Sequence, residues 1–186
     1  MTDLKESPAQ TAGPYVHIGL TPSFAGLAEM YGGIDLGAAM VTGDVDGRRI
    51  AFTGRVIDGE GAPLTDALVE IWQADAQGRY GPSNGFTGWG RQPSDAETGF
   101  FRFDTIKPGR VAGHAPHLSL WIVARGINLG LNTRAYFDDE AEANAADPVL
   151  RRAGDRAATM VARGTKDGYH LDIHLQGSEE TVFLDV

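Results

Sequence analysis

Residues 117–124 read HLSLWIVA, and this stretch sets the fold class of the chain. In an extended strand its two leucines and its isoleucine point to one side, and Trp121 and Val123 point to the other. A strand with apolar residues on both sides is typical of the middle of a sandwich or of a subunit interface. We therefore expect a strand here that is buried on two sides.

Further strands are expected upstream of this stretch. Residues 50–57 and 67–72 alternate in hydrophobicity, and the residues DGEG at 58–61 separate them. This pattern predicts a strand, a turn and a strand, joined either as a β-hairpin or by a crossover to a neighbouring strand. Residues 100–105 form a short aromatic strand that ends before the KPG turn at residues 107–109.

A half-buried strand is expected near the C-terminus, because apolar and polar residues alternate there. The apolar positions are Leu171, Ile173 and Leu175, and the polar positions are His170, Asp172 and His174. Three ligands on one side of a strand can chelate zinc. Such a row is far more often a solvated or interface face.

One late helix and one long loop complete the pattern. Asp147 and Pro148 form a helix start, with aspartate at the N-cap and proline at the first helical position. The helix is predicted to run to about Arg163 and to stop before Gly164. Residues 77–99 contain six glycines and two prolines and have no apolar period, which predicts a long and functional loop.

Several short strands with one late helix predict an all-β fold, a mostly antiparallel β-sandwich with long loops. The chain has 186 residues and is 42% hydrophobic, enough for one core and too little for two. We expect a single domain over residues 1–186. Residues 1–14 are polar and without periodicity, so we expect an extended N-terminal arm that lies on a surface.

Composition excludes several classes of function. The formal net charge of −9 argues against nucleic-acid binding, which needs clustered lysine and arginine. The chain has no cysteine, so disulfides and iron–sulfur clusters are excluded. The first ten residues have no apolar segment of a signal peptide, and no apolar stretch is long enough to span a membrane. We expect a cytoplasmic protein.

Three stretches resemble the intradiol ring-cleavage dioxygenases. They are VEIWQADAQGRY at residues 69–80, TIKPG at 105–109 and HLSLWIVARG at 117–126. The resemblance covers roughly residues 50–140 and the N-terminal arm, and it implies the same β-sandwich. It also implies a ferric site made by two tyrosines and two histidines.

Only half of that iron site is present in this sequence. Tyr80 and His117 match one tyrosine and one histidine of the family, whereas Val111 and Ser119 stand where the family has the other two ligands. Fe(III) is a hard ion that favours anionic oxygen donors, and valine supplies no donor. We therefore expect no metal in this chain's own pocket and no catalytic residue there.

The two matching residues also have an ordinary interpretation. Tyr80 can be a loop tyrosine that covers the core, and His117 can be a hydrogen-bonded core histidine. His114 and His117 have the spacing of a metal pair, but the intervening Pro116 favours a turn.

Three more stretches resemble the iron-free chain of family members that are built from two related chains. They are QTAGPYVHIG at residues 10–19, ARGIN at 124–128 and ETVFLDV at 180–186. The resemblance implies a hetero-oligomer with a related chain that holds the Fe(III). It also implies that this chain contributes substrate-binding residues to the partner's site, namely Thr11, Gly13, Pro14 and Arg125.

The chemistry of an arginine supports that role independently. A substrate with a carboxylate on its ring needs a cation to hold it, and a guanidinium does this with defined geometry. Together with this role, the resemblance implies a subunit of a dioxygenase that cleaves a small aromatic acid with O₂, and we expect the isolated chain to be inactive. A self-sufficient enzyme with a rearranged metal site is the less favoured enzymatic reading.

A different class of function is also compatible with part of the sequence. Residues 54–70 (GRVIDGEGAPLTDALVE) resemble the first strands of prealbumin-like sandwiches, which act as non-catalytic scaffolding or binding modules. Those modules lack the WQADAQGRY and KPG elements. An adjacent gene for a related chain with a complete ligand set would favour the dioxygenase.

Overall fold

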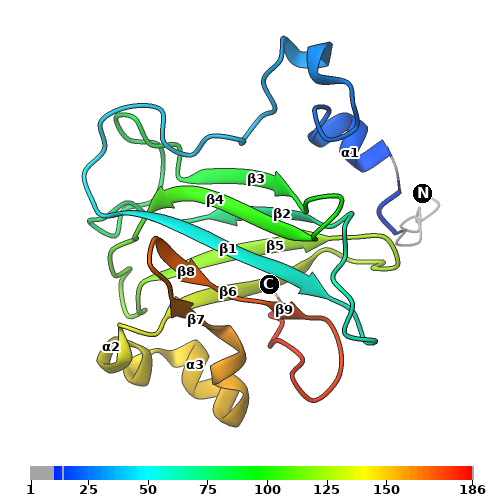
Figure 1. Ribbon diagram of the computed structural model, residues 1–186. Helices are drawn as coiled ribbons and strands as arrows, with labels where there is room; N and C mark the ends of the chain where they lie inside the picture. Colours follow the sequence, from blue (N-terminus) through cyan, green and yellow to red (C-terminus); the bar gives the residue numbers. More distant parts are fainter. Residues whose placement is uncertain (1–10, 14, 186) are drawn as a thin grey trace, which may run out of the picture.

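A computed structural model describes residues 11–13 and 15–185, and strands dominate it (Figure 1). The strands are β1 (Arg49–Ile57), β2 (Leu68–Trp72), β3 (Trp89–Pro93), β4 (Phe100–Ile106), β5 (His117–Val123), β6 (Leu131–Phe137), β7 (Val161–Gly164), β8 (Gly168–His170) and β9 (Ile173–His174). The helical segments are α1 (Tyr15–Leu20), the 3₁₀ turn η1 (Ala28–Tyr31), α2 (Ala141–Ala146), α3 (Pro148–Ala153) and the 3₁₀ stretch η2 (Gly154–Met160).

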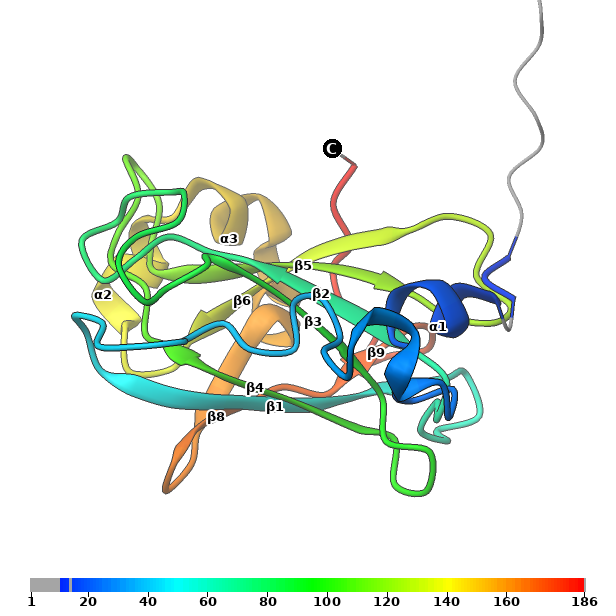
Figure 2. The ribbon, with the colours of Figure 1, turned by 90° about the horizontal axis from the view of Figure 1, so that it is seen from above.

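The strands are hydrogen-bonded in the order β3-β2-β5-β6-β7-β8-β1-β4, and β9 pairs with β1. The pairs β1·β8, β1·β9 and β6·β7 are parallel, and the other five are antiparallel. The path folds into two layers, with β2, β5 and β6 in one and β1 and β4 in the other (Figure 2). The predicted, mostly antiparallel β-sandwich is confirmed.

The core fills the space between these layers. Phe52 and Val56 of β1 and Phe101 and Phe103 of β4 form one hydrophobic cluster with the inward residues of the opposite layer. Those opposite residues are Val69, Ile71, Leu118, Leu120 and Ile122. The alternation of the sequence therefore sets which side of each strand faces the core.

Strand β5 lies in the middle of its layer, between β2 and β6. Its leucines and isoleucine are buried as predicted, and on the outer side His117 is buried too. Trp121 and Val123 on that outer side are only half-buried. The prediction of burial on two sides is therefore right for the inner face and only partly right for the outer one.

The connection between β1 and β2 is a crossover between the two layers. Strand β1 pairs with β4, β8 and β9, whereas β2 pairs with β3 and β5. Residues 58–67 therefore pass from one layer to the other, and the hairpin alternative is excluded.

The late helix begins as predicted but is shorter. Asp147 is its N-cap, and the carboxylate accepts hydrogen bonds from the amides of Val149 and Leu150. Gly154 then adopts φ +59° and ψ −130°, which ends α3. The prediction was wrong beyond that point, because residues 161–164 pair with β6 and β8 as strand β7.

Two other segments differ from the sequence-based expectation. The predicted loop at residues 77–99 contains β3, which pairs along the whole of β2. The predicted strand at residues 170–175 is divided into β8 and β9, both parallel to β1. Its alternation is still observed, because Leu171 and Ile173 are buried and the three polar residues between and beside them are half-buried.

Within residues 11–13 and 15–185, no helix is long and apolar enough to cross a membrane.

Candidate functional site

His117 opens β5 on the outer face and is 3% exposed. Its Nδ1 lies 2.8 Å from the carbonyl oxygen of Ala115, so Nδ1 carries the proton and donates. Its Nε2 is buried and has no hydrogen-bond partner among the described residues. Burial lowers the pKa of His117 to about 4, so the imidazole is neutral at pH 7.

A polar network fills the space beside His117. The Tyr136 ring packs 5.6 Å from the His117 ring, measured between centroids. The Tyr136 hydroxyl donates to Asp147 Oδ1 at 3.1 Å and accepts from Arg134 Nη1 at 3.3 Å. His114 lies against the same network, with Nδ1 at 3.2 Å from Asp147 Oδ2.

Asp147 is the centre of this network and is 1% exposed. Burial raises the pKa of its carboxyl, but hydrogen bonds from the amides of Ala115, Leu150 and Val149 outweigh burial and hold the pKa below its usual value. The same carboxylate is the N-cap of α3. The buried carboxylate of Asp147 therefore links this polar network to the start of α3.

The other positions of the expected iron site hold no ligand set. The side chain of Tyr80 is exposed, and its ring stacks on Trp72 with centroids 6.1 Å apart and planes at 4°. Ser119 pairs with Trp72 on β2 and with Arg134 on β6. Val111 lies in the loop before β5, where its carbonyl accepts from the amide of His114.

These residues do not fit a ferric ion. Val111 offers no donor atom and Ser119 offers only a neutral hydroxyl, and Tyr80 packs against a tryptophan ring. In the described part of the chain, no group of three or more His, Cys, Asp or Glu side chains could hold a metal ion. His117 contacts the Ala115 carbonyl through Nδ1 and the ring of Tyr136, and its buried Nε2 is left without a hydrogen-bond partner among the described residues.

The N-terminal arm ends beside the turn that follows β5, and both views show these segments close together (Figures 1 and 2). The hydroxyl oxygen of Thr11 accepts a hydrogen bond from the amide of Gly126 at 2.7 Å. The carbonyl of Gly13 accepts from the amide of Val16 at the start of α1. The structure thus brings Thr11 and Gly13 next to Arg125, while Pro14 lies outside the described residues.

Helix α1 is fastened by His17, which sequence reasoning did not identify. His17 is 8% exposed, and its Nε2 lies 2.9 Å from the carbonyl oxygen of Asp66, so Nε2 donates. Its Nδ1 lies 3.0 Å from the hydroxyl of Thr21 and accepts from it. These two contacts fix α1 on the connection between β1 and β2.

Arg125 follows directly after β5 and meets the same connection. Its Nε lies 2.8 Å from Asp66 Oδ2, and its side chain is 76% exposed. Arg125 lines a mostly apolar hollow of about 330 Å³, together with residues of the arm and α1. The other lining residues include Gly13, Val16, His17 and Phe24. A cation at the edge of an apolar hollow is suited to an aromatic acid.

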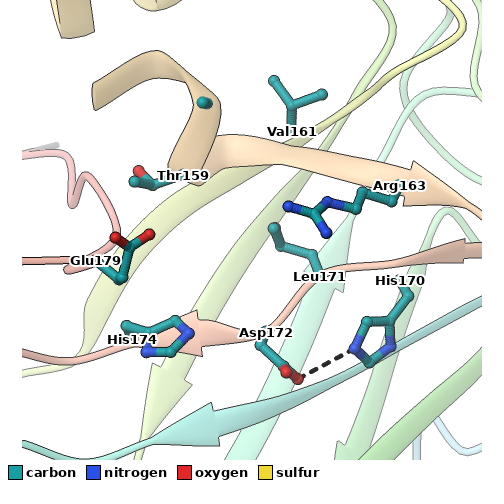
Figure 3. A pocket seen from close by; sticks show the side chains of 9 residues that line it. Thr159, Val161, Arg163, His170, Leu171, Asp172, His174 and Glu179 are labelled. Carbon is teal, nitrogen blue, oxygen red and sulfur yellow. Dashed lines mark ion pairs between the residues drawn. The ribbon is translucent and has the colours of Figure 1, made fainter. Parts of the chain in front are cut away.

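The row His170, Asp172 and His174 lines a different hollow, of about 270 Å³ (Figure 3). Asp172 is engaged by Arg55, whose Nη2 donates to Oδ2 at 2.6 Å. His170 Nε2 lies 3.2 Å from Asp172 Oδ1, and Figure 3 shows His174 on the other side, next to Glu179. Because Arg55 and His170 already contact the Asp172 carboxylate, the contacts favour a polar row around the Arg55–Asp172 ion pair over a zinc site.

Comparisons with known proteins relate the chain to the dioxygenases. The sequence model of a family described as Dioxygenase matches residues 21–177. The α chain of protocatechuate 3,4-dioxygenase from Pseudomonas putida is 42% identical over 197 residues, covering 98% of this chain and 97% of that protein. The β chain of protocatechuate 3,4-dioxygenase from Burkholderia cepacia is 35% identical over 187 residues, covering 83% of this chain and 79% of that protein.

A solved structure shares the fold. The intradiol ring-cleavage dioxygenase from Tetranychus urticae superposes with a TM-score of 0.62 at 19% identity, covering 77% of this chain and 88% of that one. At this identity the likeness concerns the fold alone.

Proposed function

The chain belongs to the intradiol ring-cleavage dioxygenase family, and on that premise we propose that it is the α subunit of a protocatechuate 3,4-dioxygenase. One observation carries the proposal. Val111 and Ser119 stand at two positions where the family resemblance implies iron ligands, and neither side chain offers the anionic donor that Fe(III) favours. In this proposal the metal is therefore held by a partner chain.

The partner in this proposal is a related β chain, which holds the Fe(III). The identity of 35% to a β chain supports such a pairing, because it places the two kinds of chain in one family. The assembled enzyme cleaves protocatechuate between its two hydroxylated carbons. Both atoms of O₂ enter the product, 3-carboxy-cis,cis-muconate, so the reaction needs no further reductant.

The role of this chain in the proposal is to position the substrate. Arg125 holds the ring carboxylate through charge-assisted hydrogen bonds, and Thr11, Gly13 and Pro14 shape the wall beside it. Thr11 and Gly13 support this because they lie against Arg125 and α1 in the structure. The hollow beside Arg125 is mostly apolar, as an aromatic ring requires.

Two further parts of the proposal rest on composition. The net charge of −9 disfavours nucleic acid as a partner. The absence of cysteine favours a cytoplasmic location. The scaffolding alternative is set aside, because the family match extends over the WQADAQGRY and KPG elements that scaffolding modules lack.

Co-expression tests the proposal. The chain is produced alone, the β chain of the same organism is produced alone, and the two are produced together, with protocatechuate cleavage measured in each preparation. We expect the two chains to co-purify and the complex to have the activity. Full cleavage activity in the isolated chain, or a β chain that does not co-purify with this chain, would contradict the proposal.

A further inference from the structure

We propose that Asp66 is a positioning residue that orients Arg125 toward the carboxylate of an aromatic acid. The inference rests on the proposed function, because it concerns the same cation. Asp66 is absent from the residues that the sequence motifs indicate, and only the folded chain brings it to Arg125.

Asp66 and Arg125 lie next to the ends of two neighbouring strands, Asp66 before β2 and Arg125 after β5. The antiparallel register of β2 and β5 places Leu68 opposite Val123. The same register, continued by two residues, places Asp66 opposite Arg125. The two side chains meet there, with Nε of Arg125 at 2.8 Å from Oδ2 of Asp66. Both residues lie in the segments that flank these strands, two residues beyond the last hydrogen-bonded pair, so the paired strand ends bring them together.

Asp66 is the fixed member of this pair. Its side chain is 27% exposed, against 76% for Arg125. Its carbonyl oxygen also accepts the hydrogen bond from the buried His17, which anchors α1. An arginine side chain that is largely in solvent has many rotamers, and a contact with a fixed carboxylate restricts them.

The contact with Asp66 Oδ2 is made by the inner guanidinium nitrogen, Nε, at 2.8 Å. Two terminal N–H groups can bind a second carboxylate side by side. Arg125 also lines the apolar hollow of about 330 Å³, so a ring attached to that carboxylate has a place to lie.

Asp66 therefore contacts both the helix that follows the N-terminal arm and Arg125. Asp66 holds α1 through its backbone and Arg125 through its side chain. Thr11 binds the amide of Gly126, the residue next to Arg125. An ion pair this exposed contributes little to folding, so a chain without the Asp66 carboxylate should fold and assemble.

The experiment uses the assembled enzyme of both chains with Asp66→Ala, Asp66→Asn, Arg125→Ala and the double variant Asp66→Ala/Arg125→Ala. The substrates are protocatechuate and catechol, which lacks the carboxylate. Asp104→Ala is the matched control, because Asp104 forms an exposed ion pair with Arg102 at 2.6 Å.

We expect both Asp66 variants to lower kcat/KM for protocatechuate by roughly 3 to 10-fold, the scale of one weakened charge-assisted contact. Cleavage of catechol and iron per β chain should not change. In the Arg125→Ala background the Asp66 substitution should add nothing, because Asp66 acts through Arg125. If Asp66 had a purely structural role, its substitution would lower kcat/KM for both substrates together.

Other outcomes overturn the inference in distinguishable ways. If kcat/KM for protocatechuate falls in Arg125→Ala but not in the Asp66 variants, Asp66 has no positioning role and the proposed function of the chain still stands. A rise in kcat/KM for Asp66→Asn shows that the carboxylate opposes the anionic substrate. If Arg125→Ala is also without effect, the proposed role of Arg125 fails and the role of Asp66 falls with it.

Discussion

Single residues decide what this chain does chemically. Val111 and Ser119 stand at two positions where the family resemblance implies iron ligands, and neither offers the anionic donor that Fe(III) favours, while the surrounding strands are formed. Losing a supporting residue around a metal costs about 10 to 100-fold in affinity, and losing two ligands costs more. Arg125 is the residue through which the remaining function is expected to act.

Arg125→Ala in the assembled enzyme should lower kcat/KM for carboxylated catechols and leave the iron content unchanged. A charge-assisted contact to an anion contributes about 1.5 to 3 kcal/mol, which corresponds to about 10 to 150-fold in kcat/KM. Steady-state kinetics on protocatechuate, with iron measured in the same samples, gives the answer. A change within about 0.5 kcal/mol would mean that Arg125 is only a solvated strand end.

His117 should make the stability of the isolated chain depend on pH. Its pKa is about 4 in the folded chain against an ordinary value of 6.5, so between these values the unfolded chain binds more protons. The free energy of unfolding is therefore highest above pH 6.5 and falls by roughly 3 kcal/mol as the pH is lowered to about 4.

Urea unfolding of the chain and of His117→Leu at several pH values measures this contribution. The difference between the two free energies should shift in favour of the variant as the pH falls from 7 to 4. Parallel curves over that range would show that protonation of His117 is not linked to unfolding.

At the scale of elements, the predictable parts are those with a local pattern. Strands β1, β2, β4 and β5 alternate in hydrophobicity, and the start of α3 has its own N-cap and proline. Strand β3 was missed because its sequence, WGRQP, has no alternation, and pairing with β2 overrides the local preference. Residues 161–164 became a strand for the same reason.

In the candidate site too, the sequence indicated only the residues that lie in local motifs. Thr11, Gly13 and Arg125 were found because they lie in motifs that resemble a family. Asp66 and His17 were not, because their partners come from distant parts of the chain and from backbone atoms. The network of Arg134, Tyr136 and Asp147 also has no local signal. Sequence patterns report neighbours along the chain, whereas these contacts exist only after folding.

Asp147 joins α3 to the pocket beside β5, so its loss should destabilise the whole fold. Asp147→Ala removes the N-cap of α3 and leaves the Tyr136 hydroxyl and the Ala115 amide without their buried acceptor. We expect a loss of about 2 to 4 kcal/mol in the free energy of unfolding. The exposed Glu142 in α2 is the control, since Glu142→Ala should change the same quantity by less than about 0.5 kcal/mol.

The measurement is chemical unfolding at pH 7, followed by circular dichroism. Equal midpoints for the two variants would show that α3 and the pocket are held together by something other than Asp147.

On the scale of the whole molecule, the chain has the β-sandwich fold of its family, while Val111 and Ser119 offer no ferric ligand set. The two-layer core is that of the family's fold, and a neutral, buried histidine and a polar network lie at the start of β5. At the far end of β5, the arm, Arg125 and Asp66 form a surface that can serve a neighbouring site. In the proposed function, the chain is the positioning subunit of a two-chain enzyme.

The iron content of the isolated chain tests this account most directly. The chain is purified without its partner, supplied with iron, and examined by metal analysis and visible absorption. We predict a colourless protein with far less than one iron per chain, because Val111 and Ser119 cannot complete a ferric site. Stoichiometric iron with a visible tyrosinate-to-iron absorption band would contradict the account.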